Sequence, residues 1–466
     1  MTGDSNIKQA GQLSQRRPVY AQTMTIIQSL TVAMGVLGTA FQAGATDLLE
    51  IYHAAQSQDA VFTAARAAHR AGQEKLPQGR SLLLPSVNLT ANSTFNDDSI
   101  SYRSPIPFFP SGTNRYNSNG YGVNLTQPLF RQQNWVAYTE AGLQVAQADA
   151  QLRTAEQDLA VRVAQAYFDV LMAQDSVQLA EAQKTAISEQ LEQAKRNFEV
   201  GTATITDTLE AQARYDLVGS QEIAAQSNLE IKKHTLQQLT NAMPGDLRQL
   251  GHQFKLEVLQ PAEMEKWVDE AQQHSPQLAV AQTAAELAEK EAARNRSGHY
   301  PTLDLVANYS ENFANGGNMG VGSDSRNAAV GVQLNMPLYQ GGAIQSKVRE
   351  AEANRDRTKE DLENTRRTIA LQVHQAYLGV VNGIAQVKAL QQALKSSESL
   401  LEASKLGQEV GVRTNLDVLN AQQQLYSTRR DLYQAEYNYL TSQLRLKAAA
   451  GTLAEDDIVR VNQALY

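Results

Sequence analysis

Four short segments of the chain alternate between apolar and polar residues. They are residues 87–92, 121–126, 303–309 and 330–335. In the first, Val87, Leu89 and Ala91 are separated by polar residues. Alternation with a period of two predicts β-strands that have one apolar and one polar face. Such strands suit a soluble sheet and equally a membrane barrel with a water-filled lumen, so the alternation alone leaves both open.

Two far longer segments have the composition of uninterrupted helices. Residues 131–199 contain no proline and only Gly142 as glycine, while residues 342–409 contain no proline. A helix over the first segment would be about 100 Å long, and soluble helices of that length usually form coiled coils. The apolar stripe is thin and rich in alanine, as at Val161 and Ala164. We therefore expect long helices that pack closely side by side.

These strands and helices belong to an internal repeat. Four landmarks recur in the same order at an offset of about 210 residues. They are LPSVNL with YPTLDL, GVNLTQPLF with GVQLNMPLY, QAYFDVL with QAYLGVV, and VGTATITDTLEAQ with VGVRTNLDVLNAQ. We interpret residues 46–250 as a first repeat of helix, strand hairpin, long helix and return helix, and residues 263–450 as a second. Residues 251–262 would link the repeats, and residues 451–466 would form a C-terminal tail.

Prolines mark the joints between strands and helices, where a missing backbone donor is tolerated. Two precede predicted strands and two stand at the far ends of strands: Pro85, Pro301, Pro128 and Pro337. Between the paired strands we predict polar loops, one over about residues 96–119 and one from Asn315 onwards. Aromatic residues gather at the strand ends, as in the girdles of membrane barrels.

The last repeated phrase begins at the end of each long helix. Its glycines, Gly201 and Gly411, can take the left-handed conformation that ends a helix, so we expect a tight turn into the next helix at both places. Asp207 and Asp417 would then lie at the start of the following helices, where a negative charge is stabilising.

Composition excludes several classes of protein. The chain has 466 residues and a formal net charge of -8, and its basic residues are scattered beside acidic ones, so nucleic acid is not an expected partner. After the N-terminal region it has no apolar run of about 20 residues, which argues against a polytopic helical membrane protein. The absence of cysteine excludes disulfides and thiolate metal sites.

The first 45 residues have the pattern of a signal peptide. A basic stretch with Lys8, Arg16 and Arg17 precedes a mostly apolar segment, and Ala43-Gly44-Ala45 provides a small-x-small cleavage site. We expect residues 1–45 to be removed on export, so that the mature chain begins near Thr46.

The sequence indicates neither an enzyme nor a cofactor-binding protein. Its seven histidines lack the spacing of metal ligands, and neither a nucleophile elbow nor a Walker motif is present. We therefore predict no catalytic residues, no metal and no cofactor.

The strand count requires assembly. Four strands cannot close a barrel, and an open sheet in a membrane would leave edge amides unsatisfied. Two copies would supply eight strands and three copies twelve. We therefore expect the chain to oligomerise, and the strand count allows either two or three copies.

Several motifs together resemble the TolC family of outer-membrane efflux proteins, closely enough to place the chain near the family's namesake. The most specific are LPSVNL, HYPTLDL, MPLYQGG, VGVRTNLDVLNAQQQLY and YNYLTSQLRLKAAAGTL, and the resemblance covers nearly the whole mature chain. It implies a mixed, mainly helical membrane protein. Three chains would form a twelve-stranded outer-membrane β-barrel, continued by a long periplasmic α-helical barrel, with residues 251–262 in an equatorial region.

The resemblance also implies a function and partners. The chain would be a homotrimeric exit duct in the bacterial outer membrane. Its barrel would contact outer-membrane lipid, and a large part of the chain would lie in the periplasm. It would serve a tripartite efflux or type I secretion system that carries drugs, toxic small molecules or proteins. An inner-membrane pump of the RND, ABC or MFS type would reach it through a periplasmic adaptor (membrane fusion) protein. The loops near Phe108 and Gly317 would lie outside the cell.

By the same resemblance, the tip of the helices is a gate. Asp417 matches the residue of the constricting acidic ring, and Asn420 stands where close relatives have a second aspartate. Arg413, Thr206 and Asp207 match the residues of a latch that holds the helix pairs shut. Gln408 stands where a tyrosine joins that latch. Stabilisation of a helix start remains an alternative role for Asp207 and Asp417.

A periplasmic coiled-coil adaptor or structural spacer is the alternative function. It would also need long helices, but four alternating strands with aromatic ends argue against it. A requirement for detergent on extraction would distinguish a membrane channel from either alternative.

Overall fold

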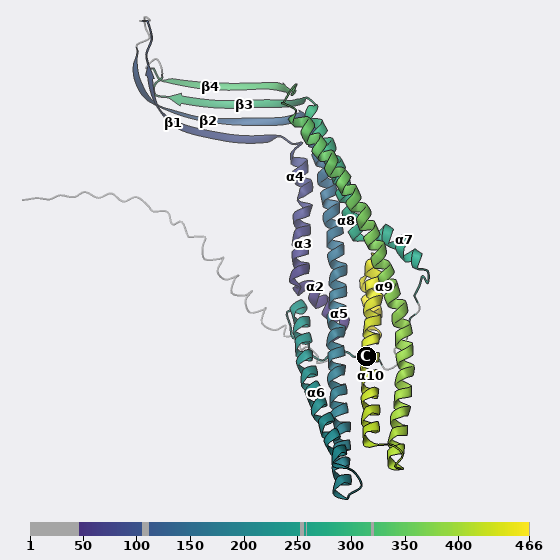
Figure 1. Cartoon of the computed structure of the whole chain (residues 1–466). Helices are drawn as coiled ribbons and strands as arrows, with labels where there is room; N and C mark the ends of the chain where they lie inside the picture. The colour runs from purple at the N-terminus through teal and green to yellow at the C-terminus, as the bar shows by residue number, and fades with distance from the viewer. Residues whose placement is uncertain (1–45, 105–110, 252–255, 258, 318–320, 466) are drawn as a thin grey trace, which may run out of the picture. The chain divides into compact units, whose positions relative to one another are not determined.

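The chain builds one four-stranded sheet and two long helical hairpins (Figure 1). The computed structural model describes residues 46–104, 111–251, 256–257, 259–317 and 321–465. The expected signal peptide, residues 1–45, and Phe108 lie outside these residues. Each repeat contributes two strands, one very long helix and one shorter return helix, which confirms the predicted order of elements.

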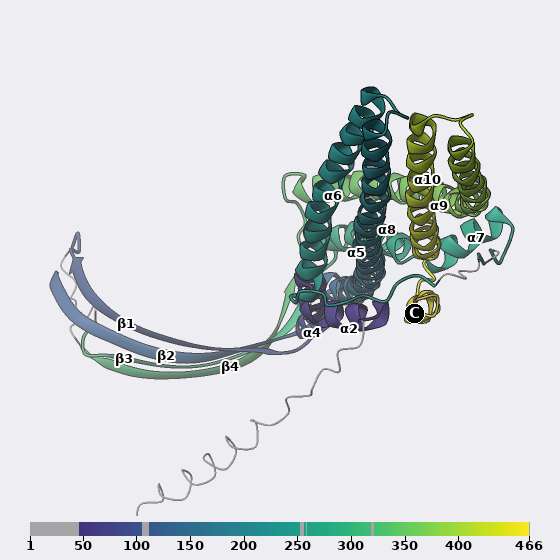
Figure 2. The same cartoon turned by 90° about the horizontal axis from the view of Figure 1, so that it is seen from below.

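The sheet is antiparallel throughout, with its strands in chain order. Its strands are β1 (Ser86–Ile100), β2 (Gly112–Phe130), β3 (Thr302–Ala314) and β4 (Ser323–Asn335). The register aligns Leu89 with Val123, and Val123 with Tyr309, so the apolar residues of neighbouring strands share one face. The strands follow a common curve (Figure 2). Among the described residues, β1 and β4 each have one edge without a partner strand.

The strands extend further than predicted, and the predicted loop over residues 96–119 is wrong for most of its length. β1 continues to Ile100 and β2 starts at Gly112, with Asp97 paired to Arg115 across the ladder. Beyond residue 92 polar residues dominate both faces of the hairpin, with Phe95 and Ile100 as the apolar exceptions in β1, so the alternation fades while the backbone pairing continues. Side-chain bonds support this extension, including Asn96 Nδ2 to Ser118 Oγ at 2.9 Å. The second loop is shorter too, because β4 begins at Ser323.

The two long helices closely match the predicted segments. They are α5 (Gln132–Glu199), with 68 residues, and α9 (Ala343–Glu409), with 67. α5 turns back into α6 (Ile205–Thr240), and α9 turns back into α10 (Asn415–Ala449). Both turns lie at the same end of the helices, side by side in two views (Figures 1 and 2).

Shorter helices lead into each pair of strands. The first repeat begins with α2 (Leu48–Gln58), α3 (Ala60–Gln73) and α4 (Lys75–Ser81), and the second with α7 (Met264–His274), α8 (Pro276–Arg296) and the short 3-10 helix η2 (Ser297–His299). Two of the breaks have a local cause. Asp59 caps α3 by accepting a bond from the backbone of Phe62, and Pro276 stands in the first turn of α8.

The main core lies where α5 and α10 meet. Phe168 makes an edge contact with Tyr167 at 5.9 Å between ring centroids and stacks on Tyr437 at 5.8 Å. Next to it, α11 (Glu455–Asn462) forms within the predicted C-terminal tail, and Leu465 bridges to Leu250. The C-terminal tail thus packs against the end of the first repeat. None of the described helices has both the length and the apolar character needed to cross a bilayer.

Candidate functional site: the helix-turn tips and the strand–helix joint

Both tips end in the same glycine turn. Gly201 has a φ of 81° and Gly411 a φ of 78°, a region that side-chain-bearing residues rarely adopt. The amide of Thr202 donates to the carbonyl of Asn197 at 2.8 Å, and the amide of Val412 donates to Gly407 at 2.8 Å. These bonds close the last turn of each long helix. Both glycines take the left-handed conformation at these turns.

Each return helix begins with a reciprocal cap. Thr414 donates its backbone amide and its hydroxyl to Asp417 Oδ2, both at 2.8 Å, while the Asp417 amide donates to Thr414 Oγ1 at 3.2 Å. Thr204 and Asp207 form the same arrangement at 2.9, 2.7 and 3.3 Å. Both aspartates therefore stabilise a helix start, which was the alternative role considered for them.

The Asp417 carboxylate is held in its charged form. The bonds from Thr414 lower the pKa of Asp417, and the positive charge of Arg413 lowers it further. Arg413 Nη1 lies 3.6 Å from Asp417 Oδ1. Because this carboxylate lies at the outermost turn of its hairpin, it presents a negative charge at the tip at neutral pH.

The candidate latch residues contact their own hairpins. Arg413 is paired with Asp417, four residues on, and Asp207 caps Thr204. Gln408 Nε2 donates to Asn415 Oδ1 at 3.3 Å, across the turn of the second hairpin. Among the contacts of the described chain none joins Arg413 to Thr206 or Asp207, so the latch stays a prediction.

Two residues that the sequence analysis missed join the hairpins instead. Arg214 on α6 reaches Asn420 and Gln423 on α10. Leu419 of α10 is 1% exposed and belongs to a small apolar cluster with residues of α5 and α6: Ile187, Leu191, Ala194, Ala211 and Val218. The repeated phrase has leucine at both positions, Leu209 and Leu419, so the sequence alone does not distinguish them. In the fold Leu419 is buried, whereas Leu209 is 61% exposed.

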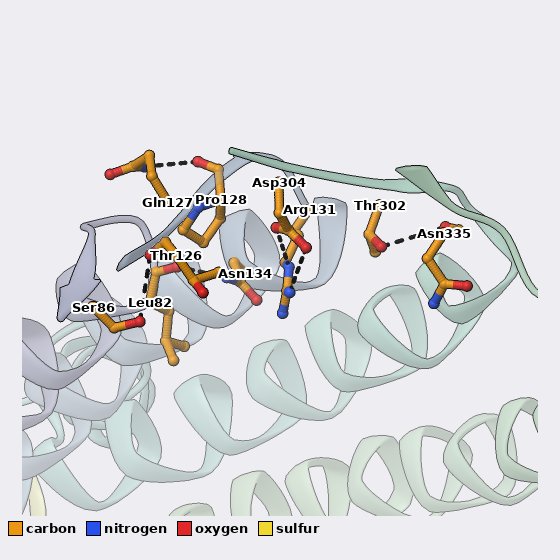
Figure 3. A network of polar contacts seen from close by, with 10 residues as sticks. All are labelled: Leu82, Ser86, Thr126, Gln127, Pro128, Arg131, Asn134, Thr302, Asp304 and Asn335. Atoms are coloured by element: carbon orange, nitrogen blue, oxygen red, sulfur yellow. Dashed lines mark hydrogen bonds and ion pairs between the residues drawn. The ribbon is translucent and has the colours of Figure 1, made fainter. Parts of the chain in front are cut away.

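A second polar site lies where the sheet meets the helices (Figure 3). Arg131 precedes α5 and binds Asp304 of β3 through two bonds, Nε to Oδ1 at 2.7 Å and Nη2 to Oδ2 at 2.6 Å. Asp304 is only 7% exposed. This fork connects the first repeat to the second at the base of the sheet, and no pattern in the sequence indicated it.

The prolines lie at this joint, close to their predicted places. Pro85 and Pro301 immediately precede β1 and β3, and Pro337 follows β4. Pro128 lies within β2 rather than after it, next to an irregularity in the pairing with β3. Gln127 Nε2 bonds the carbonyl of Pro128 at 2.7 Å (Figure 3). The break in register is where the strand gives way to α5.

Within the described ranges, no group of three or more histidine, aspartate and glutamate side chains could hold an ion. The chemistry of the tips is therefore that of charged and amide side chains around two tight turns.

A model of the family described as "Outer membrane efflux protein" matches residues 41–242 and 267–452. The chain belongs to this family. It is 34% identical over 441 residues to "Outer membrane protein TolC" of Vibrio cholerae, covering 94% of this chain and 97% of that protein. It is also 34% identical over 416 residues to "Alkaline protease secretion protein AprF" of Pseudomonas aeruginosa, covering 89% of this chain and 86% of that one.

Solved structures agree on the fold. The outer membrane channel CmeC of Campylobacter jejuni matches with a TM-score of 0.76 at 17% identity, over 90% of this chain and 89% of that chain. These structures establish the mixed helix-and-sheet fold. The family and the relatives above 30% identity establish the outer-membrane location with a large periplasmic part and the role of an exit duct. The relatives of this chain are channel proteins rather than enzymes. The family assignment replaces the alternative function, that of a periplasmic adaptor or structural spacer.

Proposed function

We propose that three copies of this chain form one continuous duct from the outer membrane into the periplasm. One observation carries this proposal. In a chain that belongs to the outer membrane efflux family, the four-stranded sheet leaves one edge of β1 and one edge of β4 without a partner strand among the described residues. Pairing β4 of one copy with β1 of the next would satisfy these edges, and three copies would bring twelve strands together. The apolar face of the sheet would then meet lipid, and the polar face would line the lumen.

The helices extend the same argument. Several apolar side chains on α9 are exposed in the single chain, among them Leu371, Leu378 and Leu400. Rows of exposed leucine on helices of this length favour packing against neighbouring copies. A ring of helical hairpins would continue the barrel as a duct without catalytic activity.

We propose that the periplasmic end of this duct closes at the tips. Three Asp417 carboxylates would form a negatively charged ring, with Asn420 one turn further along α10. The lowered pKa of Asp417 supports a ring that stays charged. The latch of Arg413 with Thr206, Asp207 and Gln408 remains part of the proposal, since these residues all lie at the two tips of one chain.

An adaptor and an inner-membrane pump would complete the system. The tips carry exposed apolar residues, including Val200, Val410 and Val412, which would suit a docking surface for an adaptor. The name of the Pseudomonas aeruginosa relative refers to protease secretion, and the family name refers to efflux. We propose that this chain serves one or both kinds of transport, as a component that takes its cargo from the pump.

Two measurements test these proposals. Native mass spectrometry of the detergent-extracted protein should show a trimer, and a stable monomer or dimer would refute the twelve-stranded barrel. In planar bilayers, multivalent cations should block the channel, because three carboxylates in a narrow pore attract them. Asp417→Ala should abolish most of that block; an unchanged block would show that the ring lies elsewhere.

A further inference from the structure

An arginine on α6 joins the two helical hairpins near their tips. The guanidinium of Arg214 donates from Nη1 to Gln423 Oε1 at 2.5 Å and from Nη2 to Asn420 Oδ1 at 3.0 Å, both on α10. Arg214 lies about two to three turns into its helix, and Asn420 about one to two turns into its own. The fork is therefore close to the two turns that carry the proposed gate.

This fork differs from the other polar contacts described at the tips, which stay within one hairpin. Arg413 pairs with Asp417, and Gln408 bonds Asn415. The fork also lies next to Leu419, which packs against α5 and α6. An apolar side chain and a guanidinium fork thus hold the second hairpin against the first at neighbouring positions of α10.

The fork is not a simple consequence of the duplication. At the offset of about 210 residues, Gln424 is the counterpart of Arg214 and Glu210 that of Asn420. Gln424 Nε2 instead bonds Thr428 of its own helix at 3.2 Å. No equivalent bond from Gln424 to Glu210 is found in the described part of the chain, so the contact is specific to one side of the repeat.

We propose that Arg214 has two linked roles: it holds the second hairpin in its resting position, and it reduces the negative charge of the constriction. Asn420 follows Asp417 by three residues, so both lie on one face of α10. The guanidinium bound to Asn420 is then about one helical turn from the Asp417 carboxylate. Three such guanidinium groups would accompany the three carboxylates of the proposed ring.

The choice of acceptor suits a contact that must break. A guanidinium binds a neutral amide oxygen less strongly than a carboxylate. Asn420 and Gln423 therefore give a geometrically defined but weaker connection, which an opening signal can overcome. The inference rests on the proposed gate, and it adds to that gate a residue that sets both its position and its ion selectivity.

Single-channel recording of the purified channel in planar bilayers tests both roles. Arg214→Gln removes the fork and the charge, so the resting conductance should rise about twofold or more, and hexamminecobalt(III) should block about tenfold more tightly. Arg214→Lys keeps the charge but cannot bind two acceptors as a fork. It should raise the conductance while leaving the block near its wild-type strength.

A carboxylate at the acceptor position sharpens the test. Asn420→Asp alone should pair with Arg214 and increase the block only modestly. In the Arg214→Gln background the same change would leave a second acidic ring unpaired, and the block should tighten much more than the two single changes predict.

Two control variants separate this effect from general ones. Arg430→Gln removes a positive charge from α10 about 15 Å further from the tip, where Arg430 bonds its neighbour Asp431. Gln424→Ala alters the counterpart of Arg214. Both should leave conductance and block unchanged, and native mass spectrometry should show intact trimers for every variant.

The outcomes distinguish this inference from the gate on which it rests. Unchanged conductance and unchanged block in Arg214→Gln would overturn the inference, and equal block in Arg214→Lys and Arg214→Gln would overturn the charge role. Asp417→Ala, recorded in parallel, tests the ring itself. If Asp417→Ala leaves the block unaltered, the ring is refuted, and the conductance of Arg214→Gln still decides whether the fork holds the hairpins.

Discussion

Truncation of Leu419 should weaken the docking of the second hairpin at the tip. Its side chain is 1% exposed and packs in a cluster contributed mainly by α5 and α6. Replacing a buried leucine by alanine costs about 3 to 5 kcal/mol in a well-packed core, and we take about 2 kcal/mol for this small cluster near the helix ends. Since about 1.4 kcal/mol is a factor of ten, the ratio of docked to undocked hairpins should fall about 30-fold in each chain.

This change should be visible in bilayer recordings. Leu419→Ala should increase the time that the channel spends in high-conductance states, while the trimer survives because the main core lies far along the helices. Leu209→Ala is the matched control, since Leu209 is the counterpart in the first repeat and is 61% exposed. If both variants behaved alike, or if Leu419→Ala recorded like the wild type, packing of this leucine would not hold the tip closed.

Further predictions concern the joint, the core and a turn. Asp304→Ala removes both bonds of the half-exposed Arg131 guanidinium and should destabilise the chain by about 1 to 3 kcal/mol. The measurement is the dissociation temperature of the oligomer, which should fall; an unchanged temperature would contradict this. Burial raises the pKa of Glu436 to about 7, so the folded state binds a proton that the unfolded state releases, and stability should fall as pH rises from about 4.5 to 7. Glu436→Gln should remove this loss of stability with rising pH. It should increase the free energy of unfolding by about 1 to 3 kcal/mol at pH 8 and change it little at pH 4, as denaturation at both pH values would show. Gly411→Ala should cost about 1 kcal/mol because its φ is 78°, whereas Gly142→Ala, with open space around it, should stabilise α5 by about 0.5 to 1 kcal/mol, as thermal melts of both variants would show.

The sequence predicted the strands only where one of their faces is apolar. Alternation identified the segments around Val87 and Leu303, which would face lipid in the proposed barrel. It gave no signal from Asn96 to Ser99 or at the start of β2, because polar residues occupy both faces of the hairpin there while the backbone pairing continues. Periodicity reports an asymmetric environment, and it is silent where the environments of the two faces are alike.

Contacts between helices that lie far apart in the sequence could not be predicted from the sequence. The repeated phrase located both turns and both capped helix starts, because glycine and Thr-x-x-Asp act locally. The partners of Arg413 and Arg214 depend on how each helix is rotated about its own axis. Arg413 forms an ion pair with Asp417 four residues away, whereas Arg214 donates a hydrogen bond to Asn420 in the other repeat. The contact of Arg214 needs the packing of α6 against α10, which no local pattern encodes.

The two open edges of the sheet have a genetic consequence. Because β1 and β4 cannot pair with each other within the chain, every duct in the proposed assembly mixes products of separate translation events. In a cell that makes equal amounts of a normal chain and a variant with a defective tip, only about one eighth of the trimers would contain normal chains alone. A gate variant should therefore be dominant over the normal allele, because the fraction of wholly normal trimers falls as the cube of the normal chain's share.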